Sequence, residues 1–198
     1  MKIGVLAVQG AVSEHVNILK KAVDEMGLQG SVSPVRFPDE IEQLDGLVIP
    51  GGESSTISRL LDAMNIRDLI IEKAEGGMQL MGTCAGSILL AKEGDEAVDR
   101  SDTELLGLMD MSVKRNAFGR QKFSFEHRLD IERIADDFHA VFIRAPAIDE
   151  CWKRCEPLSH VKDTIVAAEQ DNLLALSFHP ELTDDIRVHK YFLEKIFG

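Results

Sequence analysis

The strongest constraint on the fold is an alternation of short apolar runs with segments of helical periodicity in the first half of the chain. Residues 3–8 form an apolar run that ends near Gly10, and the next apolar residues recur at helical spacing until Gly27. Such runs are typical of strands buried on both faces. The same alternation predicts strands at residues 31–36, 45–50 and 78–81 and helices at 54–64 and 87–92. Short loops between these elements indicate a parallel sheet with helices on both faces.

The second half contains more strand-like runs than the first. These runs lie at residues 106–113, 128–131, 139–144, 164–169 and 173–178. A last helix is expected at 184–197, and the acidic, glycine-containing segment 93–104 is expected to be a surface loop. No repeat or low-complexity linker divides the chain. We therefore expect one domain over residues 1–198, an α/β flavodoxin-like three-layer sandwich with a mostly parallel central sheet and extra antiparallel strands in the second half.

The charge and the cysteine count exclude several classes of protein. The chain has 22 Lys and Arg against 34 Asp and Glu, a net charge of −12 that repels nucleic-acid phosphates. No apolar run approaches the roughly 18 to 20 residues of a membrane helix, and the apolar N-terminus leads into Gln9-Gly10 rather than a signal-peptide cleavage site. Three cysteines, an odd number, favour a reducing compartment. We expect a cytoplasmic protein that binds neither nucleic acid nor membrane.

The segment Gly82-Thr83-Cys84-Ala85-Gly86 is the strongest local signal for chemistry. A glycine two residues before and two after a nucleophile, between a strand and a helix, is the pattern of a nucleophile elbow. Cys84 would then lie at a helix N-terminus, where the dipole favours a negatively charged sulfur. The alternative is a buried structural cysteine in a tight turn.

A catalytic thiol needs a base, and His179-Pro180-Glu181 offers one directly after a predicted strand. Residues two apart in extended backbone point the same way, so Glu181 can accept from one ring nitrogen while the other faces the thiol. The alternative is a strand-end histidine that a nearby acid merely satisfies. With Cys84 present, we favour a triad of Cys84, His179 and Glu181.

The loop Pro50-Gly51-Gly52-Glu53-Ser54 follows a predicted strand and precedes a helix. Successive glycines can turn backbone N–H groups into a cavity, which suits an oxyanion hole or a phosphate. A phosphate is the poorer choice because the loop lacks the lysine of a P-loop and Glu53 would repel the ligand. A plain turn between strand and helix is the third reading.

The remaining polar residues give weaker signals. Arginines such as Arg115 and Arg144 could hold a substrate carboxylate or pair with surface acids, and the sequence does not decide between these roles. His15 could support the site from behind. The other histidines are expected to be solvated or locally hydrogen-bonded: His127, His139, His160 and His189. Cys151 and Cys155, with His160 nearby, lack a second pair of ligands, so no metal site is predicted.

Taken together, the motifs resemble class I, triad-type glutamine amidotransferases, and more narrowly the glutaminase subunit of the two-component pyridoxal 5′-phosphate synthase. Three blocks distinguish the narrower family: Gln9-Gly10-Ala11-Val12-Ser13-Glu14-His15, Gly51-Gly52-Glu53-Ser54 and Arg115-Asn116-Ala117-Phe118-Gly119-Arg120-Gln121. Segments 95–104 and 151–163 depart from the family pattern.

The resemblance implies that Cys84 attacks the side-chain amide of L-glutamine and that water hydrolyses the resulting thioester, releasing L-glutamate and ammonia. Cys84, His179 and Glu181 would be catalytic, without cofactor or metal. Gly51, Gly52 and Ala85 would supply the oxyanion hole. The same resemblance implies a glutamine pocket lined by Gly52, Glu53, Ser54, Arg115, Ile143 and Arg144.

The resemblance also implies a partner. In this family the ammonia passes to a (β/α)8-barrel synthase subunit that makes pyridoxal 5′-phosphate, in a complex of twelve synthases and twelve glutaminases. The glutaminase is nearly inactive until the partner reorders the oxyanion loop. A Gly51-Gly52 peptide suits such a change because glycine accepts either sign of φ.

Three other functions compete with this hypothesis. A glutaminase that serves the synthase of histidine biosynthesis would share the triad but lack the 115–121 block. A flavodoxin-like cysteine hydrolase would act on peptides or aldehydes, and a glutamine-dependent ammonia assay would separate it. A catalytically silent regulatory partner would be unaffected by replacement of Cys84.

Overall fold

The computed structural model describes residues 1–115 and 124–197 and has an α/β fold with a mixed, mostly parallel sheet. The helices are α1 Val12–Glu25, α2 Pro38–Ile41, α3 Ser54–Ala63, α4 Arg67–Glu75, α5 Ala85–Leu90, α6 Glu96–Asp99 and α7 Arg187–Phe197, with a 3-10 turn η1 at Pro180–Leu182. The strands are β1 Lys2–Leu6, β2 Ser31–Val35, β3 Gly46–Ile49, β4 Gln79–Thr83, β5 Ala91–Gly94, β6 Met109–Lys114, β7 Ser124–Ile131, β8 Ala135–Ile143, β9 Ala147–Cys151, β10 Glu156–Val161, β11 Thr164–Gln170 and β12 Leu173–Leu176.

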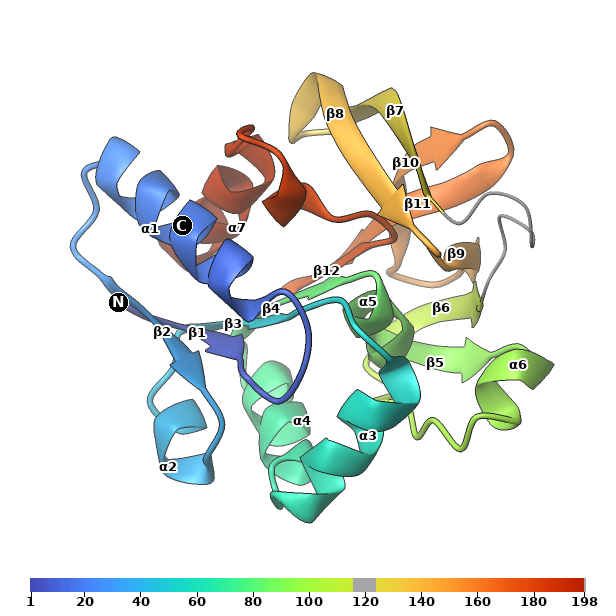
Figure 1. Ribbon diagram of the computed structural model, residues 1–198, viewed down its shortest axis with the longest axis horizontal. Coiled ribbons are helices and arrows are strands. Elements are labelled where there is room, and N and C mark those ends of the chain that lie inside the picture. Colours follow the sequence, from blue (N-terminus) through green and yellow to red (C-terminus); the bar gives the residue numbers. More distant parts are fainter. Residues whose placement is uncertain (116–123, 198) are drawn as a thin grey trace.

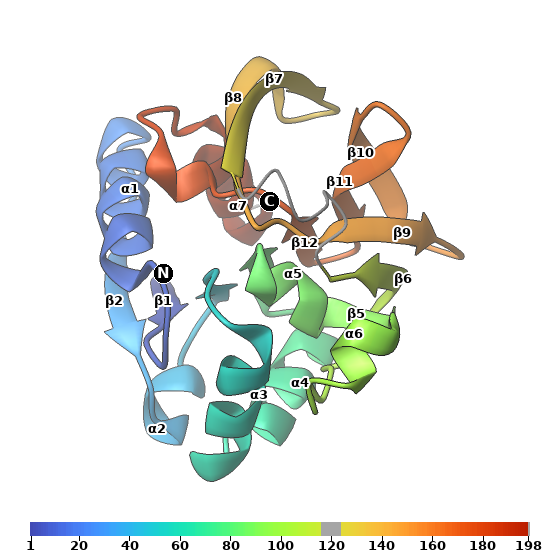
Figure 2. The same cartoon turned by 45° about the vertical axis from the view of Figure 1, so that its right-hand side comes forward.

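One half of the main sheet is parallel and lies between two layers of helices. Its strands follow the order β2-β1-β3-β4-β12, and Figures 1 and 2 show α1 and α7 on one face with α3 and α4 on the other. Successive residues of β3 point to opposite faces: Leu47 and Ile49 join one apolar core, and Val48 joins the other. Strands buried on both faces explain the continuous apolar runs in the sequence.

The other half of the sheet is mostly antiparallel. From β12 the order continues β11-β9-β6-β5, and β10 also pairs with β11. Strands β7 and β8 form a separate antiparallel pair. These are the extra antiparallel strands that the second half of the sequence predicts.

The sheet brings three loops to one edge, and this edge holds the candidate site. Ile49 of β3 is in register with Gly82 of β4, and Thr83 of β4 is in register with Leu176 of β12. Parallel strands in register end together, so the residues after β3, β4 and β12 meet. The backbone N–H of His179 donates to the carbonyl of Val141 at 2.8 Å, which ties this edge to β8.

The structure corrects the expectation of a surface loop at 93–104. Residues 96–99 form α6, and the carboxylate of Asp95 caps it by accepting from the N–H groups of Ala97 and Val98. Val98 of this helix is buried in the apolar core. In the sequence, one buried residue among acidic neighbours gives no clear periodicity. The pattern also missed α2, α4, β5, β9 and β10, and the last helix begins at Arg187 rather than at residue 184.

Within residues 1–115 and 124–197, none of the helices has the length and apolar character that crossing a membrane requires.

Candidate active site

Cys84 lies in a sharp turn between β4 and α5, at φ 50° and ψ −107°. Its backbone N–H donates to the carbonyl of Leu176 at 2.8 Å, which holds the turn against β12. A positive φ is costly for a residue with a side chain, so the surrounding structure must impose it. The conformation is that of the predicted nucleophile elbow.

The glycines on either side of Cys84 are required by close backbone packing. A Cβ on Gly82 would lie 2.6 Å from the backbone of Gly86, and a Cβ on Gly86 would lie 2.1 Å from the carbonyl oxygen of Ile49. Both distances are far below van der Waals contact. The spacing of glycines around Cys84 therefore follows from the tight crossing of β3, β4 and α5.

The imidazole of His179 lies beside Cys84. A Cβ on Gly51 would lie 2.5 Å from Cε1 of His179 and 3.2 Å from Cβ of Cys84, so both residues pack against the same glycine. On its other side, Nδ1 of His179 lies 2.7 Å from Oε1 of Glu181, and this carboxylate is fully buried. The structure thus brings the thiol, the imidazole and the carboxylate together.

The pKa of His179 reflects two opposing effects. Burial lowers it, but interactions with Cys84 and Glu181 outweigh the burial and raise the pKa to about 10. The ring is therefore protonated at neutral pH. An imidazolium next to Cys84 stabilises a negatively charged sulfur.

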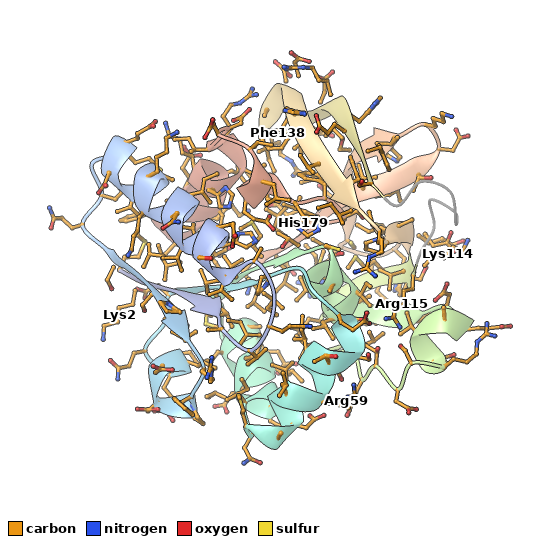
Figure 3. The ribbon with its side chains drawn as sticks, viewed as in Figure 1. Lys2, Arg59, Lys114, Arg115, Phe138 and His179 are labelled. Carbon is orange, nitrogen blue, oxygen red and sulfur yellow. The ribbon has the colours of Figure 1, made fainter. Side chains whose placement is uncertain are left out.

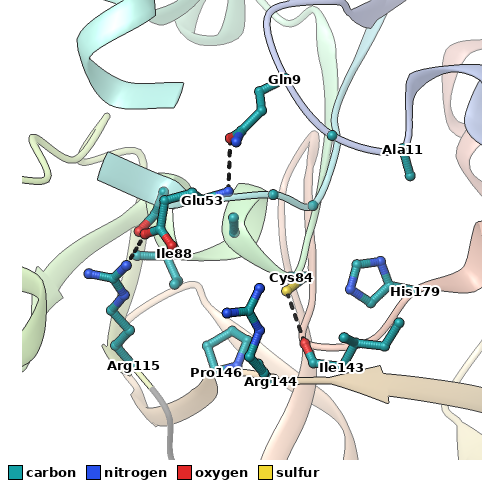
Figure 4. A pocket seen from close by; sticks show the side chains of 15 residues that line it. Gln9, Ala11, Glu53, Cys84, Ile88, Arg115, Ile143, Arg144, Pro146 and His179 are labelled. Atoms are coloured by element: carbon teal, nitrogen blue, oxygen red, sulfur yellow. Dashed lines mark hydrogen bonds and ion pairs between the residues drawn. The ribbon is translucent and has the colours of Figure 1, made fainter. Parts of the chain in front are cut away.

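A cleft of about 500 Å³ opens in front of Cys84 (Figure 4). Its lining residues are Gln9, Gly10, Ala11, Gly51, Gly52, Glu53, Ser54, Cys84, Ala85, Ile88, Arg115, Ile143, Arg144, Pro146 and His179. Every predicted oxyanion and glutamine-pocket residue is among them. Glu181 is absent because it lies behind His179.

The cleft carries charges of both signs at its mouth. The guanidinium of Arg115 forms an ion pair with the carboxylate of Glu53. Arg144 has no ion pair within the described residues, and Figure 4 shows it on the opposite side of the sulfur from His179. The sulfur of Cys84 lies 3.8 Å from the carbonyl oxygen of Ile143.

Gln9 supports the glycine loop and was not assigned a role from the sequence. Its side-chain oxygen accepts from the backbone N–H of Glu53 at 2.9 Å. Gly10 beside it has φ 104°, and a Cβ there would lie 1.7 Å from the carbonyl oxygen of Gly51. The signal that could have revealed this contact is the position of Gln9-Gly10 after the first strand of a parallel sheet, since such loops line the ligand-binding edge.

The structure overturns the expectation that His189 is solvated or only locally bonded. His189 is fully buried on α7, and its Nε2 lies 3.4 Å from Nδ1 of His15, 174 positions away in the sequence. Its spacing from Ile186 and Leu193 places it on the buried face of the helix, a signal visible in the sequence. His139, by contrast, pairs with Glu126 on an exposed strand surface.

Cys151 and Cys155 lie outside the cleft. Their thiols interact at the end of β9, and this contact lowers the pKa of Cys151 while raising that of Cys155. Neither thiol is in a disulfide. The described part of the chain contains no group of three or more His, Cys, Asp or Glu side chains that could hold a metal ion.

The polar loop expected at 115–121 is described only at its first residue. Arg115 follows β6, and Figure 3 shows it at some distance from His179, which lies near the middle of the molecule. Residues Asn116 to Gln121 lie outside the described residues.

Comparison with known proteins identifies the family. A model of the SNO glutamine amidotransferase family matches residues 5–197. The chain belongs to the SNO glutamine amidotransferase family. A relative from Methanosarcina barkeri, named pyridoxal 5′-phosphate synthase subunit PdxT, is 52% identical over 100% of this chain and 98% of its own. A protein of the same name from Archaeoglobus fulgidus is 51% identical over 98% of each chain.

Solved structures agree with this family. A structure described as a glutamine amidotransferase superposes with a TM-score of 0.87 at 43% identity, covering 99% of both chains. A further glutamine amidotransferase from Thermotoga maritima, at 13% identity, has a TM-score of 0.63 and covers 100% of this chain and 96% of its own. At that identity the likeness concerns the fold, which matches the predicted α/β class.

Proposed function

We propose that this chain is the glutaminase subunit of a pyridoxal 5′-phosphate synthase and that Cys84, His179 and Glu181 catalyse its hydrolysis of L-glutamine. The observation that carries the assignment of residues is the contact of one strained cysteine with a buried His179–Glu181 pair at the head of the cleft. Family membership and relatives named as subunits of the synthase support the substrate and the use of the ammonia.

The reaction begins with the protonated form of His179. The Cys84 thiolate attacks the amide carbon of glutamine, and the C–N bond breaks after His179 protonates the leaving nitrogen. Ammonia departs, and a γ-glutamyl thioester remains on the sulfur of Cys84. His179, now neutral, takes a proton from water, whose oxygen attacks the thioester and releases glutamate. Glu181 holds the ring and stabilises its charged form.

Backbone donors in the cleft would stabilise the oxyanion. Ala85 is the first residue of α5, so the helix leaves its N–H unpaired. Gly51 and Gly52 supply the opposing backbone, beside the thiol. Removing one such donor typically costs about 10²- to 10³-fold in rate.

The charged groups at the mouth match the two ends of an amino acid. The guanidinium of Arg144 suits the α-carboxylate, because it faces the cleft without an ion pair among the described residues. The carboxylate of Glu53 suits the α-ammonium, with Arg115 holding it in place. Gly52, Ser54 and Ile143 complete the pocket.

The partner would be a (β/α)8-barrel synthase subunit that receives the ammonia, in a complex of twelve copies of each. Residues 1–198 would act as one glutaminase domain, as the family match over 5–197 and the continuous ten-stranded sheet suggest. Three unpaired thiols favour a cytoplasmic setting.

Co-purification with the candidate synthase tests the whole assignment. We expect the complex to form product with glutamine as the nitrogen source. In Cys84→Ala, product formation with glutamine should be abolished, while product formation with ammonium salts should continue. Activity with ammonium but not with glutamine in the unsubstituted complex would reject the role. Equal glutaminase rates with and without the synthase would reject gating of the oxyanion loop by the partner. The mass of the complex in solution checks the stoichiometry.

A further inference from the structure

We propose that His15 is a positioning residue for the triad: its Nε2–H donates to Oε2 of Glu181 and fixes the carboxylate that orients His179. The inference rests on the proposed function of Cys84, His179 and Glu181. It adds a fourth group to the site, from a helix that does not line the cleft.

The observation that points to His15 is an incompletely satisfied carboxylate. Oε1 of Glu181 accepts a hydrogen bond from Nδ1 of His179 at 2.7 Å. Oε2 is buried and has no hydrogen bond of good geometry within the described residues. His15 Nε2 lies 3.3 Å from Oε2, and both side chains are fully inaccessible to solvent. A buried charged oxygen needs a donor, and among the described residues this nitrogen is placed to supply it.

Thr83 competes for the same ring nitrogen. Its Oγ1 lies 3.1 Å from Nε2 of His15, closer than Oε2 of Glu181, and this contact has hydrogen-bonding geometry. A carboxylate is the stronger acceptor of the two, because hydrogen bonds to ionised groups are about twice as strong as neutral ones. A hydroxyl can also be satisfied as a donor to another group, whereas an ionised carboxylate can only accept. We therefore assign the N–H to a shared hydrogen bond in which Glu181 is the stronger acceptor and Thr83 the second.

His189 determines which nitrogen of His15 carries the proton. Nε2 of His189 lies 3.4 Å from Nδ1 of His15, and Nδ1 of His189 is buried without a partner. If His15 donated from Nδ1, His189 would have to bury an unpaired N–H, and a bare nitrogen of His15 would face the carboxylate. If His189 donates from Nε2, both costs disappear and His15 is left with its proton on Nε2.

Both histidines are held neutral, which suits a positioning role. Burial, then His189 and His179, lower the pKa of His15 well below its ordinary value. Burial lowers the pKa of His189 to about 3, against a weaker opposing effect of Asp185. A neutral donor at His15 leaves the negative charge of Glu181 available to the His179 imidazolium, whereas a second cation would compete for it.

The arrangement makes the helical layer part of the catalytic apparatus. His15 comes from the first turn of α1 and His189 from α7, and these two helices pack on the same face of the sheet (Figure 1). Glu181 lies on η1, which packs against α1. The orientation of His179 is thereby set by packed helices rather than by the loops at the mouth.

The test uses the glutaminase in complex with its synthase and compares His15→Leu with His15→Gln. The leucine removes the donor at similar size, and the glutamine amide restores an N–H near the position of Nε2. We expect H15L to lower kcat for glutamine hydrolysis about tenfold with KM unchanged. We expect H15Q to recover most of the loss, and Thr83→Val to cost less than threefold.

A double-substitution cycle separates positioning from simple packing. In a Glu181→Gln background the donor has no carboxylate to hold, so H15L should cost little further rate. His189→Leu is expected to lower kcat about threefold in the wild-type background and to have no further effect in the Glu181→Gln background. This variant tests the proposal if H15L does not fold. Thermal unfolding of each variant monitors its stability.

Several outcomes would overturn the proposal. An H15Q variant as slow as H15L, equal losses in H15L and T83V, or an H15L loss that persists in full on E181Q would each show that His15 does not act through Glu181. These results differ from failure of the proposed function, in which C84A and E181Q themselves would leave glutamine hydrolysis unchanged.

Discussion

The cleft has two walls of opposite character. Behind His179 on one wall, the carboxylate of Glu181 is completely buried and accepts a hydrogen bond from the imidazole. On the other, the side chain of Glu53 is 41% exposed and pairs with Arg115 at the cleft mouth. The same residue type is thus fully enclosed in one place and partly open to solvent in the other, as the proposed roles in proton chemistry and in substrate binding require.

This contrast suggests a division of work between the walls. Groups on the buried wall are fixed before substrate arrives, so their loss should lower kcat with little effect on KM. In the proposed binding mode, groups on the open wall would contact the parts of glutamine that do not react, so their loss should raise KM. Each prediction below tests one side of this division.

The largest effect is expected for Cys84→Ala. Removal of the nucleophile should lower kcat for glutamine hydrolysis about 10⁴-fold or more, since no other described thiol lines the cleft. Glutamine should still bind, because the open wall is unchanged. Calorimetric titration with glutamine and an ammonia assay measure the two quantities, and loss of binding together with activity would break the division.

Glu181→Gln should follow, with kcat about 10³-fold lower and KM within a few-fold. The amide keeps the shape of the carboxylate but removes the charge that supports the His179 imidazolium. Because interaction with Glu181 helps to raise the pKa of His179, the pH at which activity falls on the alkaline side should move to lower pH. A pH–rate profile of the complex checks this, and an unchanged profile would contradict the role of Glu181.

Arg144→Gln should act on the other side of the division. Loss of a charged hydrogen bond to the α-carboxylate should raise KM for glutamine about 10- to 100-fold and leave kcat within a few-fold. Arg100→Gln is a matched control, because Arg100 pairs with Glu96 on the exposed surface of α6. Steady-state kinetics of both variants suffice. A fall in kcat at constant KM would contradict the role of Arg144 in binding the α-carboxylate.

The smallest effect concerns stability. The pKa of His189 is about 3 in the folded protein, so below pH 6.5 the unfolded chain binds a proton that the folded chain does not. This histidine therefore lowers wild-type stability as pH falls, by about 1.4 kcal/mol per pH unit between about pH 6.5 and 3. His189→Leu lacks this loss. Urea unfolding at pH 7.5, 6.0 and 5.0 should show that the free energy of unfolding of the variant rises relative to that of wild type as the pH falls. A difference that stays the same at all three pH values would contradict the burial of a neutral ring.

The residues in and behind the cleft also differ in how far the sequence could predict them. Cys84 and its flanking glycines, and His179 with Glu181, were predictable because each group is local and short-range geometry dictates its spacing. The contact between His15 and His189 joins α1 to α7 across 174 positions, and no local pattern encodes it. Gln9 was likewise unassigned, since its contact with Glu53 depends on how two loops meet.

The fold divides in the same way. The parallel strands were predictable because burial on both faces requires continuous apolar runs such as 45–50. Strands β9 and β10 lie in the antiparallel half, and each contains exposed residues that interrupt the apolar run. The helix at 96–99 escaped prediction because one turn capped by Asp95 is too short to show periodicity.

The central claim is that Cys84 carries the glutamyl group. Acid quenching of the complex during turnover with glutamine, followed by peptide mapping, tests it most directly, with Cys151 and Cys155 as internal controls. We predict a γ-glutamyl adduct on the peptide that contains Cys84 and none on the other two cysteines. An adduct on Cys151 or Cys155, or glutamine turnover undiminished in Cys84→Ala, would contradict the account.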